Sequence, residues 1–140
     1  FCSLFLVAIA VQAQDAQVSA EQAPAEPAPL EQPVGDAARG RLVFGPCRTC
    51  HYPELSMGHN NGPNLHRIFG KVAGKQEGFA YYSEEFKAAQ FVWTPELMFT
   101  WLENPMAMFP GSSMMSLGVP DAQRRADLIE FLKQASAREP

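Results

Sequence analysis

The first helix of the folded part of the chain is predicted from the spacing of its apolar residues. Asp36 has the side chain of a helix cap, and Ala37, Gly40 and Phe44 then fall on one face. Pro46 is expected to end this helix. A glycine inside a helix costs about 1 kcal/mol relative to alanine, so Gly40 predicts that another helix crosses closely at this point.

A second helix is predicted to begin at Thr94-Pro95-Glu96. These residues combine a capping hydroxyl, a proline in the first turn and an acid near the positive end of the helix. Asn104-Pro105 is expected to end it. Its apolar face consists of Leu97, Met98, Trp101 and Leu102.

A third helix is predicted to open at Pro120-Asp121 and to run toward the C-terminus. Its apolar residues follow the i, i+3, i+4, i+7 pattern of a helix face. They are Leu128, Phe131, Leu132 and Ala135. The charged residues between them are expected on the solvent side: Arg124, Arg125, Asp127 and Lys133.

The segments between these helices are rich in Gly, Pro and Asn and predict loops. Residues 52–78 form the longest loop, in which the pattern allows one helical turn over 64–69, and residues 83–89 favour a short helix. A second loop spans 109–118, with a turn at Pro110-Gly111. No segment has a strand pattern of useful length, so the sequence predicts an all-α domain with long loops.

The N-terminal 35 residues differ from the rest. Residues 1–11 are apolar except for Ser3, and Val11-Gln12-Ala13 has small residues where a signal peptidase cleaves, so 1–13 is interpreted as the remnant of a signal peptide. A membrane anchor is the alternative interpretation. Residues 14–35 consist mainly of Ala, Gln, Glu and Pro and predict a disordered linker. The folded domain is therefore predicted to span 36–140.

Charge limits the classes of partner. The net charge of −4 argues against a nucleic-acid partner. Four acidic residues precede Asp36 without any Lys or Arg, and the remaining 11 acidic residues equal the 11 basic ones in number. The predicted domain is therefore formally neutral.

The strongest chemical signal is Cys47-Arg48-Thr49-Cys50-His51. Two thiols three positions apart, followed at once by a histidine, are typical of a c-type haem attachment site. The thiols can reach the two vinyl groups of one porphyrin, and the imidazole of His51 can bind the iron. The alternatives are half of a zinc site or a redox dithiol. Zinc would require a second ligand pair, and the only other cysteine, Cys2, lies in the predicted signal remnant.

The sixth ligand of the iron decides the function. An open position favours a haem enzyme or a gas-sensing module, whereas a thioether favours electron transfer. Six methionines compete: Met57, Met98, Met106, Met108, Met114 and Met115. Met114 and Met115 follow the Pro110-Gly111 turn, and composition alone does not choose between them. His59 and His66 are rival ligands.

The order of motifs resembles that of class I cytochromes c, of the mitochondrial type and the bacterial c2-like group, from about Asp36 to the C-terminus. The matching motifs are Cys47-Arg48-Thr49-Cys50-His51, Gly62-Pro63-Asn64-Leu65-His66, Phe69-Gly70, Gly78-Phe79-Ala80-Tyr81, Trp93-Thr94, Trp101-Leu102-Glu103-Asn104-Pro105, Phe109-Pro110-Gly111-Ser112-Ser113-Met114 and Arg125-Ala126-Asp127-Leu128-Ile129. The resemblance implies the cytochrome c fold: three main helices, shorter ones and long loops around one haem c that is bound covalently through Cys47 and Cys50.

The same resemblance assigns roles to individual residues. It makes Met114 the second axial ligand beside His51. Pro63 would accept the ring N–H of the axial histidine, and Ser112 would keep the hydroxyl role of a family threonine. Tyr81 and Trp93 match residues that bind a haem propionate, and Gly40 and Phe44 match the N-terminal helix that crosses the last helix at Leu128 and Phe131.

Two departures from the family change the expectation. Trp101 replaces a tyrosine beside the methionine, and an indole N–H donates but does not accept a hydrogen bond. Met106, Ala107 and Ser113 occupy positions that are often basic, so a more apolar docking surface is expected.

The resemblance implies an electron carrier without catalytic residues, expected to be a monomer. It would serve membrane redox complexes such as a quinol–cytochrome c reductase and a terminal oxidase or reaction centre. The periplasm is the expected location, and tethering to the outer face of the inner membrane is the alternative.

Overall fold

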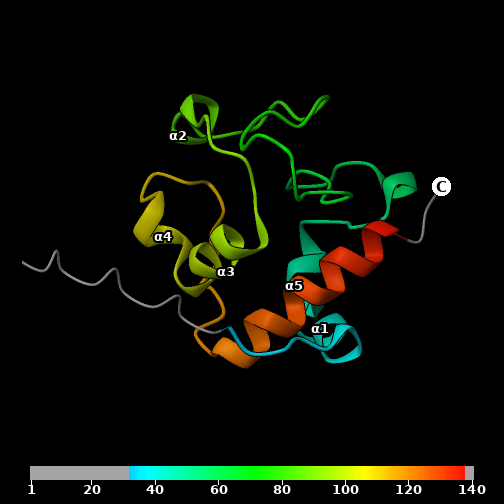
Figure 1. The fold of residues 1–140 in the computed structure, drawn as a ribbon. Coiled ribbons are helices and arrows are strands. Elements are labelled where there is room, and N and C mark those ends of the chain that lie inside the picture. Colours follow the sequence, from blue (N-terminus) through cyan, green and yellow to red (C-terminus); the bar gives the residue numbers. More distant parts are fainter. Residues whose placement is uncertain (1–31, 138–140) are drawn as a thin grey trace, which may run out of the picture. The chain divides into compact units, whose positions relative to one another are not determined.

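The computed structural model describes residues 32–137, which contain five α-helices and two short 3-10 helices (Figure 1). They are α1 (Ala37–Val43), η1 (Gly45–Thr49), η2 (Leu55–Met57), α2 (Glu84–Ala88), α3 (Pro95–Glu103), α4 (Pro105–Met108) and α5 (Ala122–Ala137). Within this part of the chain no strand forms, and the only bridge pairs Val72 with Val92. The all-α prediction is therefore confirmed. The predicted signal remnant, and the linker before residue 32, lie outside the described residues.

Side chains cap the predicted helices at the expected positions. The Asp36 carboxylate accepts the Arg39 N–H at 2.8 Å at the start of α1. Thr94 Oγ1 accepts the Leu97 N–H at 3.1 Å at the start of α3. Each bond satisfies a backbone N–H that has no acceptor inside its own helix. Helices α1 and α3 therefore begin directly after their capping residues.

Helices α1 and α5 cross at Gly40, as predicted (Figure 1). A Cβ atom on Gly40 would lie 1.9 Å from the carbonyl oxygen of Asp127 and 2.8 Å from Cβ of Phe131. The rings of Phe44 and Phe131 pack beside this contact, with centroids 5.3 Å apart. Only glycine permits the two backbones to approach so closely.

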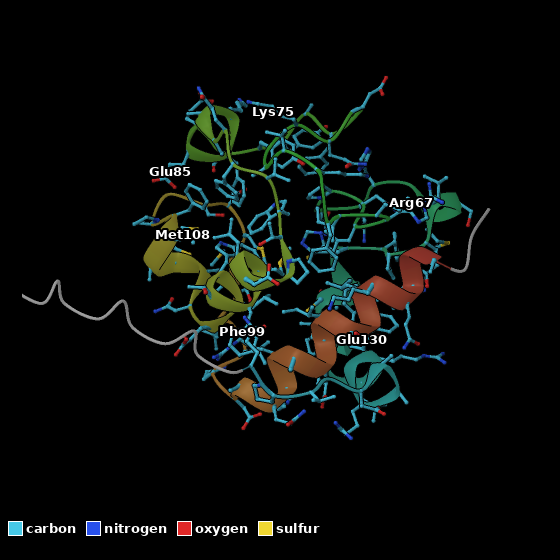
Figure 2. All side chains as sticks on the ribbon, viewed as in Figure 1. Arg67, Lys75, Glu85, Phe99, Met108 and Glu130 are labelled. Carbon is cyan, nitrogen blue, oxygen red and sulfur yellow. The ribbon has the colours of Figure 1, made fainter. Side chains whose placement is uncertain are left out.

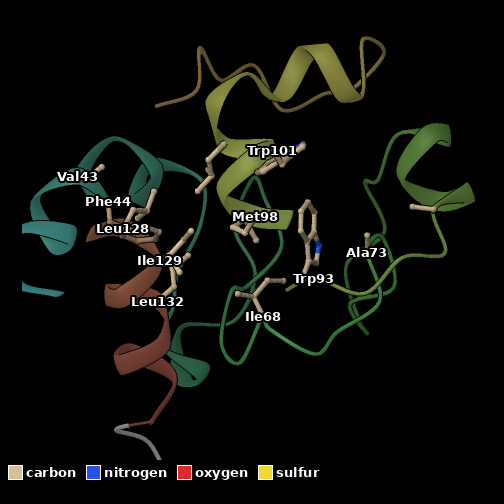
Figure 3. Close-up of a cluster of buried hydrophobic side chains, with 12 residues drawn as sticks. Val43, Phe44, Ile68, Ala73, Trp93, Met98, Trp101, Leu128, Ile129 and Leu132 are labelled. Atoms are coloured by element: carbon tan, nitrogen blue, oxygen red, sulfur yellow. The ribbon is translucent and has the colours of Figure 1, made fainter. Parts of the chain in front are cut away.

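The buried core has contributions from both ends of the domain (Figure 3). Phe44 and Leu128 pack at the crossing of α1 and α5, where they are 2% and 1% exposed. Met98 and Trp101 face inward from α3, and the Trp101 ring meets the Trp93 ring edge-on at 5.1 Å. This second group forms one side of the cavity described below.

Two charged residues of α5 are buried, so their predicted place on the solvent side is wrong. The side chain of Asp127 is 3% exposed and that of Arg125 is 6% exposed. Asp127 accepts hydrogen bonds from the Asp36 N–H and from Arg39, each at 2.8 Å. Arg125 donates to the Val119 carbonyl at 2.9 Å. Its guanidinium lies 4.4 Å from the centroid of the ring of Phe99, a residue labelled in Figure 2. These partners offset the cost of burying the two charged side chains.

Two local predictions also differ from the structure. Helix α1 ends at Val43, and Pro46 lies inside η1 rather than ending the first helix. Residues 64–69 form turns instead of a helical turn. The predicted end of the second helix at Asn104-Pro105 is confirmed, since α3 ends at Glu103 with Asn104 as its cap. Pro105 also begins α4, because a proline is tolerated at the first position of a helix. None of the helices within residues 32–137 is long and apolar enough to cross a membrane.

Candidate functional site

The two thiols lie in and directly after the 3-10 helix η1. The N–H groups of Cys50 and His51 both donate to the Cys47 carbonyl, at 3.1 and 2.9 Å, so the motif is wound into a tight turn. Both cysteines are unpaired and half-buried. Burial raises the pKa of the Cys47 thiol, which disfavours the thiolate that a redox dithiol uses.

His51 is buried and held in one orientation. Its Nδ1 donates to the Pro63 carbonyl at 2.8 Å, which leaves the lone pair of Nε2 for a metal. Gly62 packs against the ring so closely that a Cβ there would lie 2.2 Å from Cε1 of His51. Burial lowers the pKa of the imidazole, and the bond to Pro63 partly opposes this effect. His51 is therefore neutral at neutral pH, the form that binds metals.

The loop before Met114 is pinned by polar contacts. The Ser112 N–H donates to the Phe109 carbonyl at 3.0 Å, and Ser112 Oγ accepts the Met114 N–H at 3.1 Å. The Glu85 carboxylate accepts the Gly111 N–H at 3.0 Å. Met114 packs against the buried core, whereas Met115 is 95% exposed. Both side chains line the cavity described below, but only that of Met114 is partly buried.

One large cavity, with a volume of about 660 Å³, brings the predicted site residues together. All eight of them line it: Cys47, Cys50, His51, Pro63, Tyr81, Trp93, Ser112 and Met114. Trp93 is 5% exposed, but Tyr81 is 78% exposed and stands at the edge of the domain. Segments from the start, middle and end of the domain thus meet around a single space.

The chemistry of the cavity fits a haem. Its lining is mainly apolar and aromatic, which suits the porphyrin ring, and among the described lining residues only Lys71 carries a full charge at neutral pH. A buried polar group also fits a haem: the Nε1–H of Trp101 is buried and has no acceptor within the described part of the chain. A buried donor without a partner costs about 1–3 kcal/mol. A haem, its propionates or its axial ligand would supply acceptors beside it.

Sequence reasoning missed several polar residues of the lining, among them Lys71 and Tyr82. Lys71 donates to the Gln76 side chain at 2.8 Å, and its partial burial lowers its pKa. The Tyr82 hydroxyl accepts the Gln76 N–H at 3.4 Å, and burial raises its pKa. Neither residue belongs to a motif that sequence spacing could mark, because loop folding alone brings them to the cavity.

The two rival histidines lie outside the cavity, whereas Met98 and Met115 line it together with Met114. Neither His59 nor His66 lines the cavity. Both ring nitrogens of His59 are engaged by backbone groups, Glu77 O at 2.8 Å and Asn64 N at 3.0 Å. Across residues 32–137, no three His, Cys, Asp or Glu side chains gather as a metal site would require. This geometry does not support the zinc alternative.

Comparison with known proteins identifies relatives of this chain. No family model matches the chain. Individual relatives do match: cytochrome c of Chlamydomonas reinhardtii is 44% identical over 108 residues, which cover 76% of this chain and 96% of that protein. Cytochrome c of Ginkgo biloba is 37% identical over 110 residues, covering 78% and 96% of the two chains. Cytochrome c2 of Blastochloris viridis is 39% identical over 102 residues, covering 73% and 80%. The chain therefore belongs to the class I cytochrome c family and carries one haem c, attached through Cys47 and Cys50.

Proposed function

We propose that this protein is a carrier of single electrons in which His51 and Met114 are the axial ligands of the haem iron. The observation that carries the proposal is the bond from Nδ1 of His51 to the Pro63 carbonyl at 2.8 Å, in the wall of the haem cavity. It fixes the tautomer in which Nε2 is free to bind iron, and it makes the imidazole a stronger donor. When bound, the haem supplies an iron that alternates between two oxidation states.

Met114 is the second ligand in this proposal. A thioether serves both oxidation states and raises the reduction potential. Ser112 holds the backbone of Met114 in place through the 3.1 Å bond from the Met114 N–H. A ligand held in this way needs little rearrangement when the iron gains or loses an electron. Apolar burial by Met98, Trp93 and Leu102 excludes water from the same space.

The surface near Met114 suggests how partners dock. Residues 104–120 contain no charged side chain, and Met115 and Leu117 within them are 95% and 97% exposed. We expect docking through apolar contact, with association rates that change little with salt. The proposed partners are a quinol–cytochrome c reductase as donor and a terminal oxidase or reaction centre as acceptor.

The proposed location is the periplasm, and its support is the sequence alone. The apolar run of residues 1–11 and the small residues of Val11-Gln12-Ala13 resemble an export signal. N-terminal sequencing of the mature protein tests this. A mature chain that begins near Gln14 supports cleavage, whereas an intact N-terminus in the membrane fraction supports an anchor.

A visible spectrum of the holoprotein tests the ligands. We expect the oxidised wild type to show a methionine–iron charge-transfer band and to bind cyanide slowly. Met114→Leu should lose the band and bind cyanide readily, whereas Met115→Leu is the matched control and should keep the wild-type spectrum. A wild type that lacks the band and binds cyanide or CO readily would favour a haem enzyme or gas sensor with a displaceable sixth ligand.

A further inference from the structure

The carboxylate of Glu85 contacts the loop that leads to Met114. Glu85 lies in the first turn of α2, and its two oxygens share the Gly111 N–H, with Oε2 at 3.0 Å and Oε1 at 3.2 Å. A Cβ on Gly111 would lie 3.0 Å from Oε1 and 3.1 Å from Cδ of Glu85. The carboxylate therefore lies directly against the loop backbone, three residues before Met114.

Glu85 extends toward this loop from a helix that is itself held in place. The ring of Phe86, the next residue of α2, packs on Phe109 with a centroid distance of 4.6 Å and meets Trp101 edge-on at 6.3 Å. On the other side of α2, a Cβ on Gly74 would collide with the Phe86 carbonyl, so two backbones touch there. Glu85, labelled in Figure 2, extends from this fixed helix to the segment that follows α4.

The loop around Met114 has few other polar ties to the rest of the domain. Among the described residues, every other hydrogen bond within 110–118 joins two residues that are two or three positions apart. The bond from Gly111 to Glu85 spans 26 positions. It is therefore the bond that fixes this loop to another element rather than to itself.

We propose that Glu85 is a positioning residue for Met114, because its carboxylate anchors the loop of residues 109–114 to α2 and so keeps the methionine in place as a ligand. This inference rests on the proposed function, since it takes Met114 as a ligand of the iron. Movement of the loop away from the cavity would break the bond to Gly111. An ionised acceptor makes that bond stronger than a neutral one, so the anchored loop opens less often.

Two substitutions at Glu85 separate the hydrogen bond from the side chain that makes it. Glu85→Ala removes the acceptor, whereas Glu85→Gln keeps one oxygen that can accept the Gly111 N–H. Glu84→Ala is the matched control, because Glu84 stands in the same helical turn with a side chain that is 89% exposed and paired only with Lys87 among the described residues. Gly40→Ala, which strains the distant α1–α5 crossing, is the control for loss of stability alone.

The first readout is the rate at which the oxidised holoprotein binds cyanide, because cyanide can bind only after Met114 has left the iron. The second is hydrogen exchange of the Gly111 N–H, followed by NMR in the reduced holoprotein. We expect Glu85→Ala to accelerate both by roughly three- to tenfold, the factor that corresponds to the loss of one net hydrogen bond. Glu85→Gln should stay close to the wild type, and the two controls should change neither rate.

Cyanide binding by Glu85→Ala at the wild-type rate would overturn the inference. Equal acceleration in Glu85→Ala and Glu85→Gln, or in Glu85→Ala and either control, would overturn it as well. If Glu85→Ala does not fold, Gly111→Ala decides, because its Cβ displaces the carboxylate and should accelerate cyanide binding. Failure of the proposed function is distinguishable from these results: the wild type itself would then lack the methionine–iron band.

Discussion

The close crossing of α1 and α5 gives a quantitative prediction for Gly40→Ala. The new Cβ would lie 1.9 Å from the Asp127 carbonyl oxygen and 2.5 Å from its carbon, both of which are backbone atoms. Ordinary contact begins near 3.4 Å, so the helices must separate by about 1.5 Å. Overpacking of this kind costs about 1–3 kcal/mol. We take the upper end of this range, about 3 kcal/mol, because backbone atoms cannot rotate out of the way as a side chain can. The higher helix propensity of alanine offsets about 1 kcal/mol of this cost.

We therefore expect Gly40→Ala to lower the free energy of unfolding of the holoprotein by about 2 kcal/mol. With a denaturant slope of about 3 kcal/mol per molar, the midpoint in guanidinium chloride falls by roughly 0.7 M, measured by far-UV circular dichroism. Gly45→Ala is the matched control, because a Cβ at Gly45 meets no atom within 4 Å. It should be neutral or slightly stabilising. Equal midpoints for the two variants would refute the reasoning.

Three further predictions concern charge and buried polar groups. Hydrogen bonding to Arg39 above all holds the pKa of Asp127 well below its usual range, so its stabilisation is complete above about pH 4 and is lost as the pH falls further. Asp127→Asn should therefore cost about 2–3 kcal/mol in denaturation at pH 7 and less at pH 3; a cost independent of pH would contradict this. Lys71→Gln should lower the reduction potential by tens of millivolts, because a nearby cation favours the reduced iron, whereas the exposed control Lys133→Gln should not. In the NMR spectrum of the reduced holoprotein, the Trp101 indole N–H should resonate downfield as a hydrogen-bonded donor, and a position typical of a free indole would count against the expected acceptor.

Local signals in the sequence predicted much of this fold. Asp36 and Thr94 mark helix starts because capping depends on neighbours three residues away. Gly40 indicated a crossing because its cost in an isolated helix needs a tertiary reason. The eight predicted site residues line one cavity. They could be named in advance because the Cys47–His51 motif and the family resemblance identify them by their position along the chain.

What the sequence did not reveal depends on partners that are distant along the chain. Asp127 lies on α5 with the pattern of a solvated residue, yet its partner Arg39 is 88 positions away. His59 binds Glu77 from 18 positions away, and only the folded loops show that its other nitrogen accepts the Asn64 N–H. Periodicity describes one face of one helix, so it cannot assign such pairs.

The size of the haem cavity has a consequence for the life of the protein in the cell. The apolar side chains that line this cavity of about 660 Å³ would pack against the haem, and a chain without haem would lack those contacts. A typical domain is stable by only about 5–15 kcal/mol, so losing contacts around a space of this size should weaken the fold. Attachment of haem to Cys47 and Cys50 is thus also a folding step. We expect a chain that lacks the haem to be cleaved faster by proteases than the holoprotein.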